Sequence, residues 1–460
     1  MKYLSTRGDA PVLGFSDVLL AGLATDGGLY MPEEWPTLKQ PSTARTYVER
    51  AVEVMLPFVE PDIDELTLTH LATEAYATFR HPAVVPLVQI DHNQWVQELF
   101  HGPTLAFKDV ALQLVGRLFD HVLAQRGERV TIVGATSGDT GSAAIDGVLG
   151  CENIDIVILY PLGRTSDVQR KQMTTVDAPN VHAVAVEGTF DDCQDMVKAM
   201  FNDVEFRQRN QLSAVNSINW ARVMAQTVYY VTASERFDEP VTFSVPTGNF
   251  GNVLAGWIAR KMGAPIHDFI ISSNTNDILT RFINDNDMSA RAVIPSLSPS
   301  MDIQVSSNFE RLLFEMNGRD GGMTAEQMQR FRATGNLAVE ADQRAEFLSG
   351  SIRAAAFDDE RTLAEMRRIY DATGGYVVEP HTATATAAAR MLSANDGGGP
   401  VITLATAHPA KFPDAVEQAI GMRPALPAHL ADLFDREERT QTVANDLATV
   451  QALVEELTAR

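Results

Sequence analysis

The sequence predicts an α/β protein with two open, twisted, mostly parallel sheets, preceded by a helical N-terminal region. The main observation is a series of short apolar segments that do not alternate with polar residues, as is typical of strands covered on both faces. These segments are 129–134, 155–160, 181–186, 241–245, 269–272 and 401–404. Helical stretches at 189–203, 252–263 and 361–373 fall between several of them, which indicates βαβ units.

Changes in residue pattern divide the chain into three parts. Residues 1–90 are polar and interrupted by Gly27-Gly28 and several prolines, and we expect them to be mainly helical. Residues 91–230 are predicted to form a first α/β domain, and residues 231–460 a second. Each part is long enough to bury part of a core without disulfides or metals.

Three segments of the second domain are expected to differ from the strand and helix pattern. The region near 285–350 lacks strand-like segments and is predicted to be a helical insertion. Gly397-Gly398-Gly399 is predicted to form a turn before the last strand. Residues 425–460 are predicted to be helices that carry a solvated cluster of charges.

The charge balance and the cysteines limit the possible partners and the compartment. The 460 residues include 60 acidic and 37 basic ones, for a net charge of −23, which disfavours nucleic acid and anionic membranes as partners. Cys151 and Cys193 have no CxxC spacing, the N-terminus has no apolar signal sequence, and no apolar segment is long enough to span a membrane. We therefore expect a cytoplasmic protein that acts on a small molecule.

A first cluster of small and hydroxyl residues, 134–141, lies directly after a predicted strand and at the start of a helix. Free N–H groups and the helix dipole make such a turn a candidate anion site. It matches neither GxGxxG nor a Walker A sequence. The alternative is that Asp139 simply caps the helix.

A second glycine-containing cluster, Pro246 to Asn252, also lies between a strand and a helix. Its two glycines allow a ligand to approach the backbone, and it has no lysine to neutralise a triphosphate. A bound phosphate ester therefore fits better than a nucleoside triphosphate. The alternative is an ordinary strand-to-helix turn.

Lys108 ends the sequence His101-Gly-Pro-Thr-Leu-Ala-Phe-Lys, in which a Gly-Pro turn and an apolar segment precede the amine. Partial desolvation in such a place lowers the pKa of a lysine and makes it a nucleophile for a Schiff base. The alternative is a surface lysine paired with Asp109. One lysine together with two anion sites matches the needs of pyridoxal phosphate, which has an aldehyde and a phosphate.

Three further motifs are ambiguous by themselves. Asn216-Ser217 followed by Arg222 fits an anion site, or a helix N-cap with Arg222 in a surface pair. Thr406 follows the last predicted strand, where open α/β sheets bind their ligands. His381, in the sequence Glu379-Pro-His-Thr, fits either a supporting hydrogen-bond donor or a structural histidine. Metal binding is not predicted, because no HExxH or Cys/His cluster occurs.

Taken in order, these motifs closely resemble the threonine synthase family. The resemblance covers nearly the whole chain and includes the N-terminal Ser5-Thr-Arg-Gly8 and Asp26-Gly-Gly-Leu-Tyr-Met-Pro32. It implies a pyridoxal-phosphate enzyme of fold type II, with the cofactor between two α/β domains. It further implies a lyase that makes L-threonine and phosphate from O-phospho-L-homoserine and water, the last step of threonine biosynthesis.

The resemblance also implies a role for each motif. Lys108 would hold the cofactor as a Schiff base and move protons at Cα and Cβ of the substrate. Thr406 would hydrogen-bond the pyridine nitrogen of the cofactor. The residues implied to bind the cofactor phosphate are Gly248, Asn249, Phe250, Gly251 and Asn252. The turn implied to bind the substrate carboxylate contains Thr136, Ser137, Asp139 and Thr140. The residues implied to bind the substrate phosphate are Asn216, Ser217 and Arg222.

One residue departs from the wider class of pyridoxal-phosphate enzymes. Many of them have Asn in a Ser-Gly-Asn turn beside the 3′-oxygen of the cofactor, where this chain has Asp139. An ionised aspartate cannot donate the corresponding hydrogen bond, so a helix cap or a water ligand is equally compatible with the sequence. Within the same class, a dehydratase or β-replacement enzyme is the alternative; outside it, a protein that binds phosphate esters without a Schiff base. We expect a monomer or a homodimer.

Overall fold

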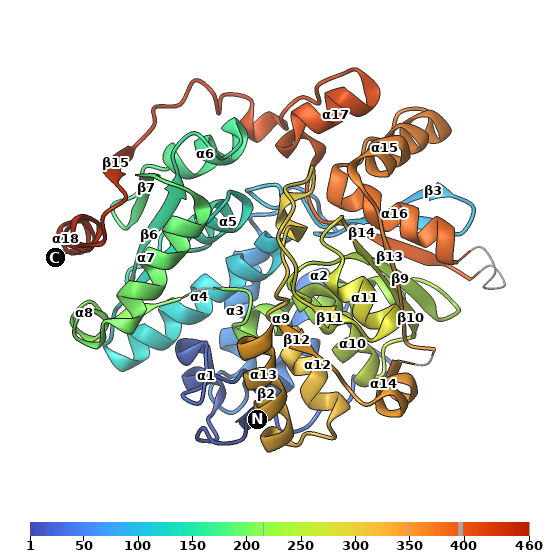
Figure 1. Ribbon diagram of the computed structural model, residues 1–460, viewed down its shortest axis with the longest axis horizontal. Helices are drawn as coiled ribbons and strands as arrows, with labels where there is room; N and C mark the ends of the chain where they lie inside the picture. Colours follow the sequence, from blue (N-terminus) through green and yellow to red (C-terminus); the bar gives the residue numbers. More distant parts are fainter. Residues whose placement is uncertain (215, 349, 394–398, 460) are drawn as a thin grey trace.

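Two sheets organise the structure, a computed structural model that describes residues 1–214, 216–348, 350–393 and 399–459. In Figure 1 the five-stranded sheet and helices α5 to α7 occupy one side, and the six-stranded sheet with α10 and α16 occupies the other. This arrangement confirms the predicted fold class. Gly397 and Gly398 of the predicted turn lie outside the described residues.

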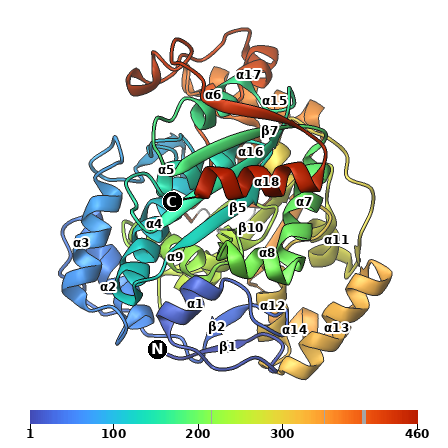
Figure 2. The ribbon, with the colours of Figure 1, turned by 90° about the vertical axis from the view of Figure 1, so that its left-hand side faces the viewer.

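The five-stranded sheet has the order β15-β7-β6-β5-β8, and all its neighbours are parallel. Its strands are β5 (Val130–Ala135), β6 (Ile154–Pro161), β7 (Val181–Glu187), β8 (Leu212–Ser213) and β15 (Thr440–Ala444). Helices α7 (Phe190–Asn202) and α18 (Leu447–Thr458) cover one face, as Figure 2 shows. Met196 and Met200 of α7 and Val450 and Val454 of α18 pack there against valines of the strands.

The six-stranded sheet has the order β13-β10-β9-β14-β4-β3, with β3 antiparallel to β4 and the other pairs parallel. Its strands are β3 (Leu87–Asp91), β4 (Gln94–Glu98), β9 (Val241–Pro246), β10 (Ile266–Ser273), β13 (Ile352–Ala356) and β14 (Val401–Ala405). Both faces of β9, β10 and β14 are buried, which explains their uninterrupted apolar sequences.

The helices lie between and around these sheets. In the N-terminal region they are α1 (Phe15–Ala21), α2 (Tyr47–Val59) and α3 (Glu65–Tyr76), beside the short strands β1 (Tyr3–Ser5) and β2 (Tyr30–Pro32). Those that flank the sheets are α4 (Lys108–Arg126), α5 (Asp139–Gly147), α6 (Asp167–Thr174), α8 (Val204–Arg209), α9 (Trp220–Ser234), α10 (Gly251–Lys261), α11 (Ile278–Asp285), α15 (Asp359–Thr373), α16 (Pro380–Leu392) and α17 (Pro413–Ile420). Among the described residues, none of the helices has the length and apolar character needed to cross a membrane.

The region 285–350 is mainly helical, as predicted. It contains α12 (Phe309–Met316), α13 (Gly321–Thr334), α14 (Ala341–Leu348) and the two-residue strands β11 (Met288–Ser289) and β12 (Asn336–Leu337). The intervening loop, 298–308, contacts several of the predicted site residues.

The prediction that 425–460 is helical is wrong for one segment, because β15 extends the five-stranded sheet. Four of its five side chains are exposed, so the strand has no apolar sequence signal. Strands β3 and β4 also escaped prediction, since they mix polar and apolar residues and β3 forms the edge of the sheet. The two sheets therefore do not follow the contiguous divisions at residues 90 and 230, because β3 and β4 join the larger sheet and β15 joins the smaller one.

Candidate active site

Lys108 is the first residue of α4, and its turn is tied to the loop that follows β14. Phe107 N–H donates to the carbonyl of Thr406 at 2.8 Å, and His408 N–H donates to the carbonyl of Leu105 at 3.0 Å. The Lys108 side chain is buried, with Nζ 3.5 Å from Asp139 Oδ2 and 3.3 Å from Ser300 Oγ. Burial lowers the pKa of Lys108, and the charge of Asp139 partly opposes this shift. An amine with a lowered pKa is the nucleophile that the sequence predicted.

Asp109 does not pair with Lys108, so the interpretation of Lys108 as a surface residue paired with this aspartate is wrong. Asp109 is fully buried and accepts hydrogen bonds from the backbone N–H of Thr104 at 2.8 Å and its hydroxyl at 2.6 Å. A Cβ atom at Gly102 would lie 2.5 Å from the Asp109 side chain. The glycine therefore allows the turn to close over this carboxyl group.

Asp139, the first residue of α5, lies between two lysines. Its Oδ1 accepts from Lys411 Nζ at 2.9 Å and from Gln169 Nε2 at 2.9 Å, while Oδ2 faces Lys108 and Ser300. Although burial opposes ionisation, Lys411 and Lys108 hold the pKa of Asp139 well below its usual range. The N-cap of α5 is Gly138, and no side chain caps this helix, so the interpretation of Asp139 as a helix cap is wrong.

The other residues of this turn have different surroundings. The hydroxyl of Thr136 accepts hydrogen bonds from the N–H groups of Gly138 at 3.0 Å and Gly141 at 2.9 Å, which fixes the shape of the turn. Ser137 is exposed and Thr140 partly exposed. Both hydroxyls are thus accessible to a ligand.

The second cluster forms the start of α10 and packs against the loop 298–308. Phe250 is in the left-handed region with φ 63°, and a Cβ atom at Gly248 would lie 2.8 Å from the carbonyl oxygen of Ser300. A Cβ atom at Gly251 would lie 3.1 Å from Asn308 Nδ2. The backbone carbonyl of Asn249 accepts from Asn308 N–H at 3.1 Å. The glycines are therefore needed for this close approach.

Asn252 adds a buried polar group at the same helix start. Its Oδ1 accepts from the hydroxyls of Tyr229 and Tyr230, the latter at 2.8 Å. Within the described part of the chain, its Nδ2 has no hydrogen-bond partner. A buried donor without an acceptor is unfavourable unless a ligand or water supplies one.

Arg222 is also buried and incompletely paired. Its side chain is 3% exposed, and its Nε and Nη1 have no partner among the described residues. Burial lowers its pKa to about 10. Its positive charge contributes to the lowered pKa of Lys108, so the two groups share one electrostatic environment. The interpretation of Arg222 as part of a surface pair is wrong.

The neighbouring residues Asn216 and Ser217 do not cap α9. The cap is Asn219, whose side chain accepts from Ala221 N–H. Ser217 Oγ lies 3.3 Å from Ser307 Oγ, and Asn216 is exposed. Ser217 thereby joins the loop 298–308, which also contacts the α10 turn.

Thr406 and His381 meet at Glu379, the N-cap residue of α16. The Thr406 hydroxyl donates to Glu379 Oε1 at 3.4 Å, and His381 Nδ1 lies 2.6 Å from Glu379 Oε2. His381 Nε2 accepts from the backbone N–H of Ser300 at 3.1 Å. Because that N–H can only donate, the ring proton is on Nδ1. His381 thus supports the loop that contacts Lys108.

Three residues of this site were not assigned a role from the sequence: Ser300, Glu379 and Lys411. Ser300 lies in a loop without a recognisable motif, so no local signal could identify it. Glu379 and Lys411 belong to motifs that were noticed, and their burial could not be predicted. Lys411 is fully buried and also donates to the carbonyl of Thr104 at 2.8 Å.

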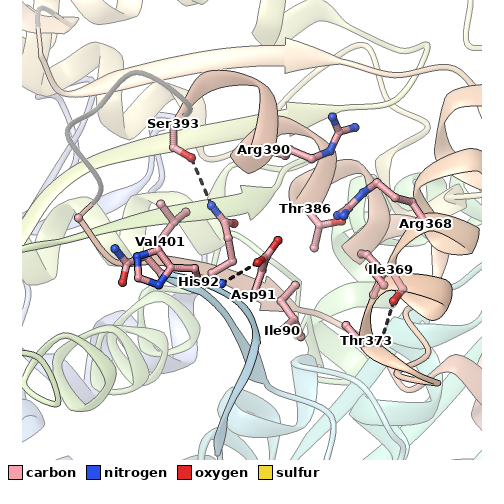
Figure 3. Close-up of a pocket in the computed structure, with 14 residues that line it drawn as sticks. Ile90, Asp91, His92, Arg368, Ile369, Thr373, Thr386, Arg390, Ser393 and Val401 are labelled. Atoms are coloured by element: carbon pink, nitrogen blue, oxygen red, sulfur yellow. Dashed lines mark hydrogen bonds between the residues drawn. The ribbon is translucent and has the colours of Figure 1, made fainter.

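A separate cavity of about 240 Å³ lies at the other end of β14. Figure 3 shows it between the β3–β4 hairpin and helices α15 and α16, with Val401, the first residue of β14, in its wall. Thr406 follows the opposite end of that strand. Arg368 and Arg390 line the cavity, and both pair with Glu365. Among the described residues, no group of His, Cys, Asp and Glu side chains is arranged to hold a metal ion.

Comparison with known proteins agrees with the geometry. Family models described as "Threonine synthase N terminus", "Pyridoxal-phosphate dependent enzyme" and "Threonine synthase, C-terminal" match residues 2–76, 79–363 and 382–454. The threonine synthase of Pseudomonas aeruginosa is 54% identical over 99% of this chain and 98% of that protein. The crystal structure of the PLP-bound threonine synthase from Brucella melitensis is 50% identical, covers 100% of both chains and has a TM-score of 0.97. The structure of the yeast enzyme is 38% identical, covers 100% of this chain and 99% of that one, and has a TM-score of 0.95.

Proposed function

Since the chain belongs to the threonine synthase family, we propose that it converts O-phospho-L-homoserine and water to L-threonine and phosphate, with pyridoxal phosphate attached to Lys108. One observation carries the assignment of the site. A buried lysine with a lowered pKa shares its surroundings with a buried arginine, Arg222, that has two unpaired nitrogens among the described residues. The first suits the aldehyde of the cofactor, and the second suits the phosphate of the substrate.

The residues present fit the cofactor. Gly248 and Gly251 leave the start of α10 free of side chains, and helix N-termini bind phosphate through their N–H groups. Asn249, Phe250 and Asn252 complete this turn, and the Nδ2 of Asn252 is an unpaired buried donor among the described residues. Thr406 offers a hydroxyl for the pyridine nitrogen. When bound, pyridoxal phosphate supplies an electron sink for the carbanion formed at the substrate.

Lys108 is the group that moves protons. Its pKa is lowered by burial, so the amine released during turnover accepts a proton from Cα and returns one to the substrate near neutral pH. Asp139 and Ser300 fix the position of Nζ, at 3.5 Å and 3.3 Å. The carboxylate of Asp139 therefore acts on the lysine, while the hydroxyls of Ser137 and Thr140 are the donors for the substrate carboxylate. The role of Thr136 is to hold this turn in shape.

Arg222 binds the substrate phosphate and stabilises its departure from Cγ. Negative charge grows on the leaving phosphate, so a fixed guanidinium in a buried site lowers the barrier as well as the dissociation constant. Asn216 and Ser217 add neutral donors at the entrance. The loop 298–308 lies against both phosphate-binding segments and limits the access of water, which must reach only Cβ.

The assignment is tested with the purified, cofactor-loaded protein. Incubation with O-phospho-L-homoserine is expected to release phosphate and L-threonine in equal amounts. A dehydratase or β-replacement enzyme would instead release ammonia and a keto acid from serine or threonine, and would release no phosphate from phosphohomoserine. That second pattern would refute the proposal.

A further inference from the structure

Glu379 is a fully buried carboxylate surrounded by hydrogen-bond donors. Its Oε2 accepts from the backbone N–H of His381 at 2.7 Å and from the His381 ring at 2.6 Å. Its Oε1 accepts from the backbone N–H of Thr382 at 2.7 Å, from the Thr382 hydroxyl at 2.6 Å and from the Thr406 hydroxyl at 3.4 Å. Five donors at a helix N-terminus stabilise the ionised form, which can accept hydrogen bonds and cannot donate them.

This carboxylate fixes the direction of the Thr406 hydroxyl. A hydroxyl has a single proton, and that of Thr406 points at Glu379. The neighbouring Thr382 cannot redirect it, because the Thr382 hydroxyl donates to Glu379 and accepts from the backbone N–H of Thr406 at 3.3 Å. The Thr406 oxygen therefore has only lone pairs left for a ligand.

We infer that Glu379 is a positioning residue that makes Thr406 accept a hydrogen bond, so that the pyridine nitrogen of the cofactor is held in its protonated form. The inference rests on the proposed function, in which Thr406 faces that nitrogen. A ring nitrogen opposite an acceptor must carry a proton to form the hydrogen bond. The sequence alone indicated a neutral hydroxyl that imposes no protonation state, and the contact with Glu379 changes this expectation.

The charges around the site leave this role to Glu379. The other ionised side chains that the site brings together are Lys108 on α4, Asp139 on α5, Arg222 on α9 and Lys411 after β14. Asp139 is occupied by the two lysines, and Arg222 is assigned to the substrate phosphate. The carboxylate of Glu379, one hydroxyl away from the ring nitrogen, is thus the counter-charge for a protonated ring. A protonated ring withdraws electrons from Cα more strongly than a neutral one.

The test reads the ring nitrogen directly. The protein is loaded with pyridoxal phosphate carrying ¹⁵N in the ring, and its nitrogen resonance is recorded at neutral pH without substrate. We expect the upfield position of a pyridinium. In Glu379→Gln the side-chain amide can donate to Thr406, which frees the Thr406 proton to point at the ring, and the resonance is expected to move downfield toward that of neutral pyridine. Glu365→Gln is the matched control, because Glu365 is buried on α15 and pairs with Arg368 and Arg390.

A neutral-pyridine resonance in the unaltered protein, or an equal resonance in Glu379→Gln, would overturn the inference. If Glu379→Gln does not fold, Thr406→Val and Thr406→Ser replace it: the valine is expected to move the resonance downfield and the serine to keep it. An unchanged resonance in Thr406→Val, with the cofactor still covalently bound, would show that Thr406 does not face the ring and would reject the assignment of this residue under the proposed function. Failure to turn over phosphohomoserine with the expected ¹⁵N shifts would reject the substrate and leave the role of Glu379 intact.

Discussion

Lys411 Nζ lies 2.9 Å from Asp139 Oδ1, on the oxygen opposite the one that faces Lys108. Asp139 therefore remains paired when Lys108 gives up its charge by bonding to the cofactor. An aspartate at this position serves the lysines, whereas an asparagine could serve only as a neutral hydrogen-bonding group. The predictions below follow from this arrangement and from the two phosphate-binding segments.

Lys108→Ala is expected to abolish covalent cofactor binding and nearly all turnover, because no other side chain offers a partly deprotonated amine at this place. Borohydride reduction of the cofactor-loaded protein followed by peptide mapping should label Lys108. Lys411 is the informative competitor, since it is buried in the same site and engaged by Asp139 and Thr104. A label on Lys411 would refute the assignment.

Asp139→Asn is expected to destabilise the cofactor-loaded protein by about 3 kcal/mol, because it leaves a buried lysine without its counter-charge. The measurement is the midpoint of urea unfolding. Lys411→Met in the same chain should recover much of the loss, since both charges are then removed together. Additive losses in the double variant would mean that the two side chains do not act as a pair.

Gly248→Ala is expected to weaken cofactor binding more than Gly251→Ala does. The added Cβ would lie 2.8 Å from the backbone oxygen of Ser300 in the first case and 3.1 Å from a side-chain nitrogen of Asn308 in the second. Backbone yields less readily than a side chain. Titration of the apoprotein with cofactor gives the two affinities, and Gly322→Ala, on the exposed side of α13, serves as the control. Equal affinities in all three variants would place the phosphate elsewhere.

Arg222→Lys is expected to lower kcat/KM for phosphohomoserine by tens-fold, about 2 kcal/mol, while the absorbance of the bound cofactor is unchanged. A lysine keeps the charge but loses the planar fork and its fixed position. The comparison is with an unphosphorylated amino acid that shifts the cofactor spectrum, whose binding should be unaffected. If both ligands lose affinity equally, Arg222 supports the fold instead of the phosphate. Arg236→Lys, at an exposed position, is the control.

Asp109→Asn is expected to flatten the pH dependence of stability. Burial, with the charge of Asp146, raises the pKa of Asp109 to about 7. Because this pKa is higher in the folded chain than in the unfolded one, the contribution of Asp109 to stability is full below pH ~4 and is lost as the pH rises to about 7. The neutral amide should therefore gain on the order of 3 kcal/mol relative to the unaltered protein between pH 5 and pH 8. Parallel pH profiles of the two proteins, with exposed Asp238→Asn as control, would contradict the assigned cause.

The sequence predicted the strands that are buried on both faces, because an apolar segment records its own burial. It also predicted the segments that form the site, because glycines and hydroxyls after a strand mark a ligand turn wherever the strand lies. Strands at the edges were not predictable in this way. In β15 the exposed side chains are polar, and pairing with β7 uses only backbone groups.

The contacts between segments of the site were beyond the sequence for a different reason. Lys411 and Asp139 are distant in the chain, and each alone has the features of an ordinary surface charge. Their pairing depends on how the loop after β14 lies against α5. The same holds for Ser300, which reaches Lys108 from a loop that no motif marks. Local patterns specify what a segment is suited to bind, and only tertiary structure specifies which segments meet.

The pairing of β15 with β7 has a consequence for how the protein is made on the ribosome. Strands β5 to β8 emerge well before β15, so the edge of β7 stays open while the whole six-stranded sheet is synthesised. An unpaired strand edge is a site for association with other chains. Nascent chains that stall after β14 should therefore associate through β7, and a chaperone that shields strand edges should act at that stage of translation.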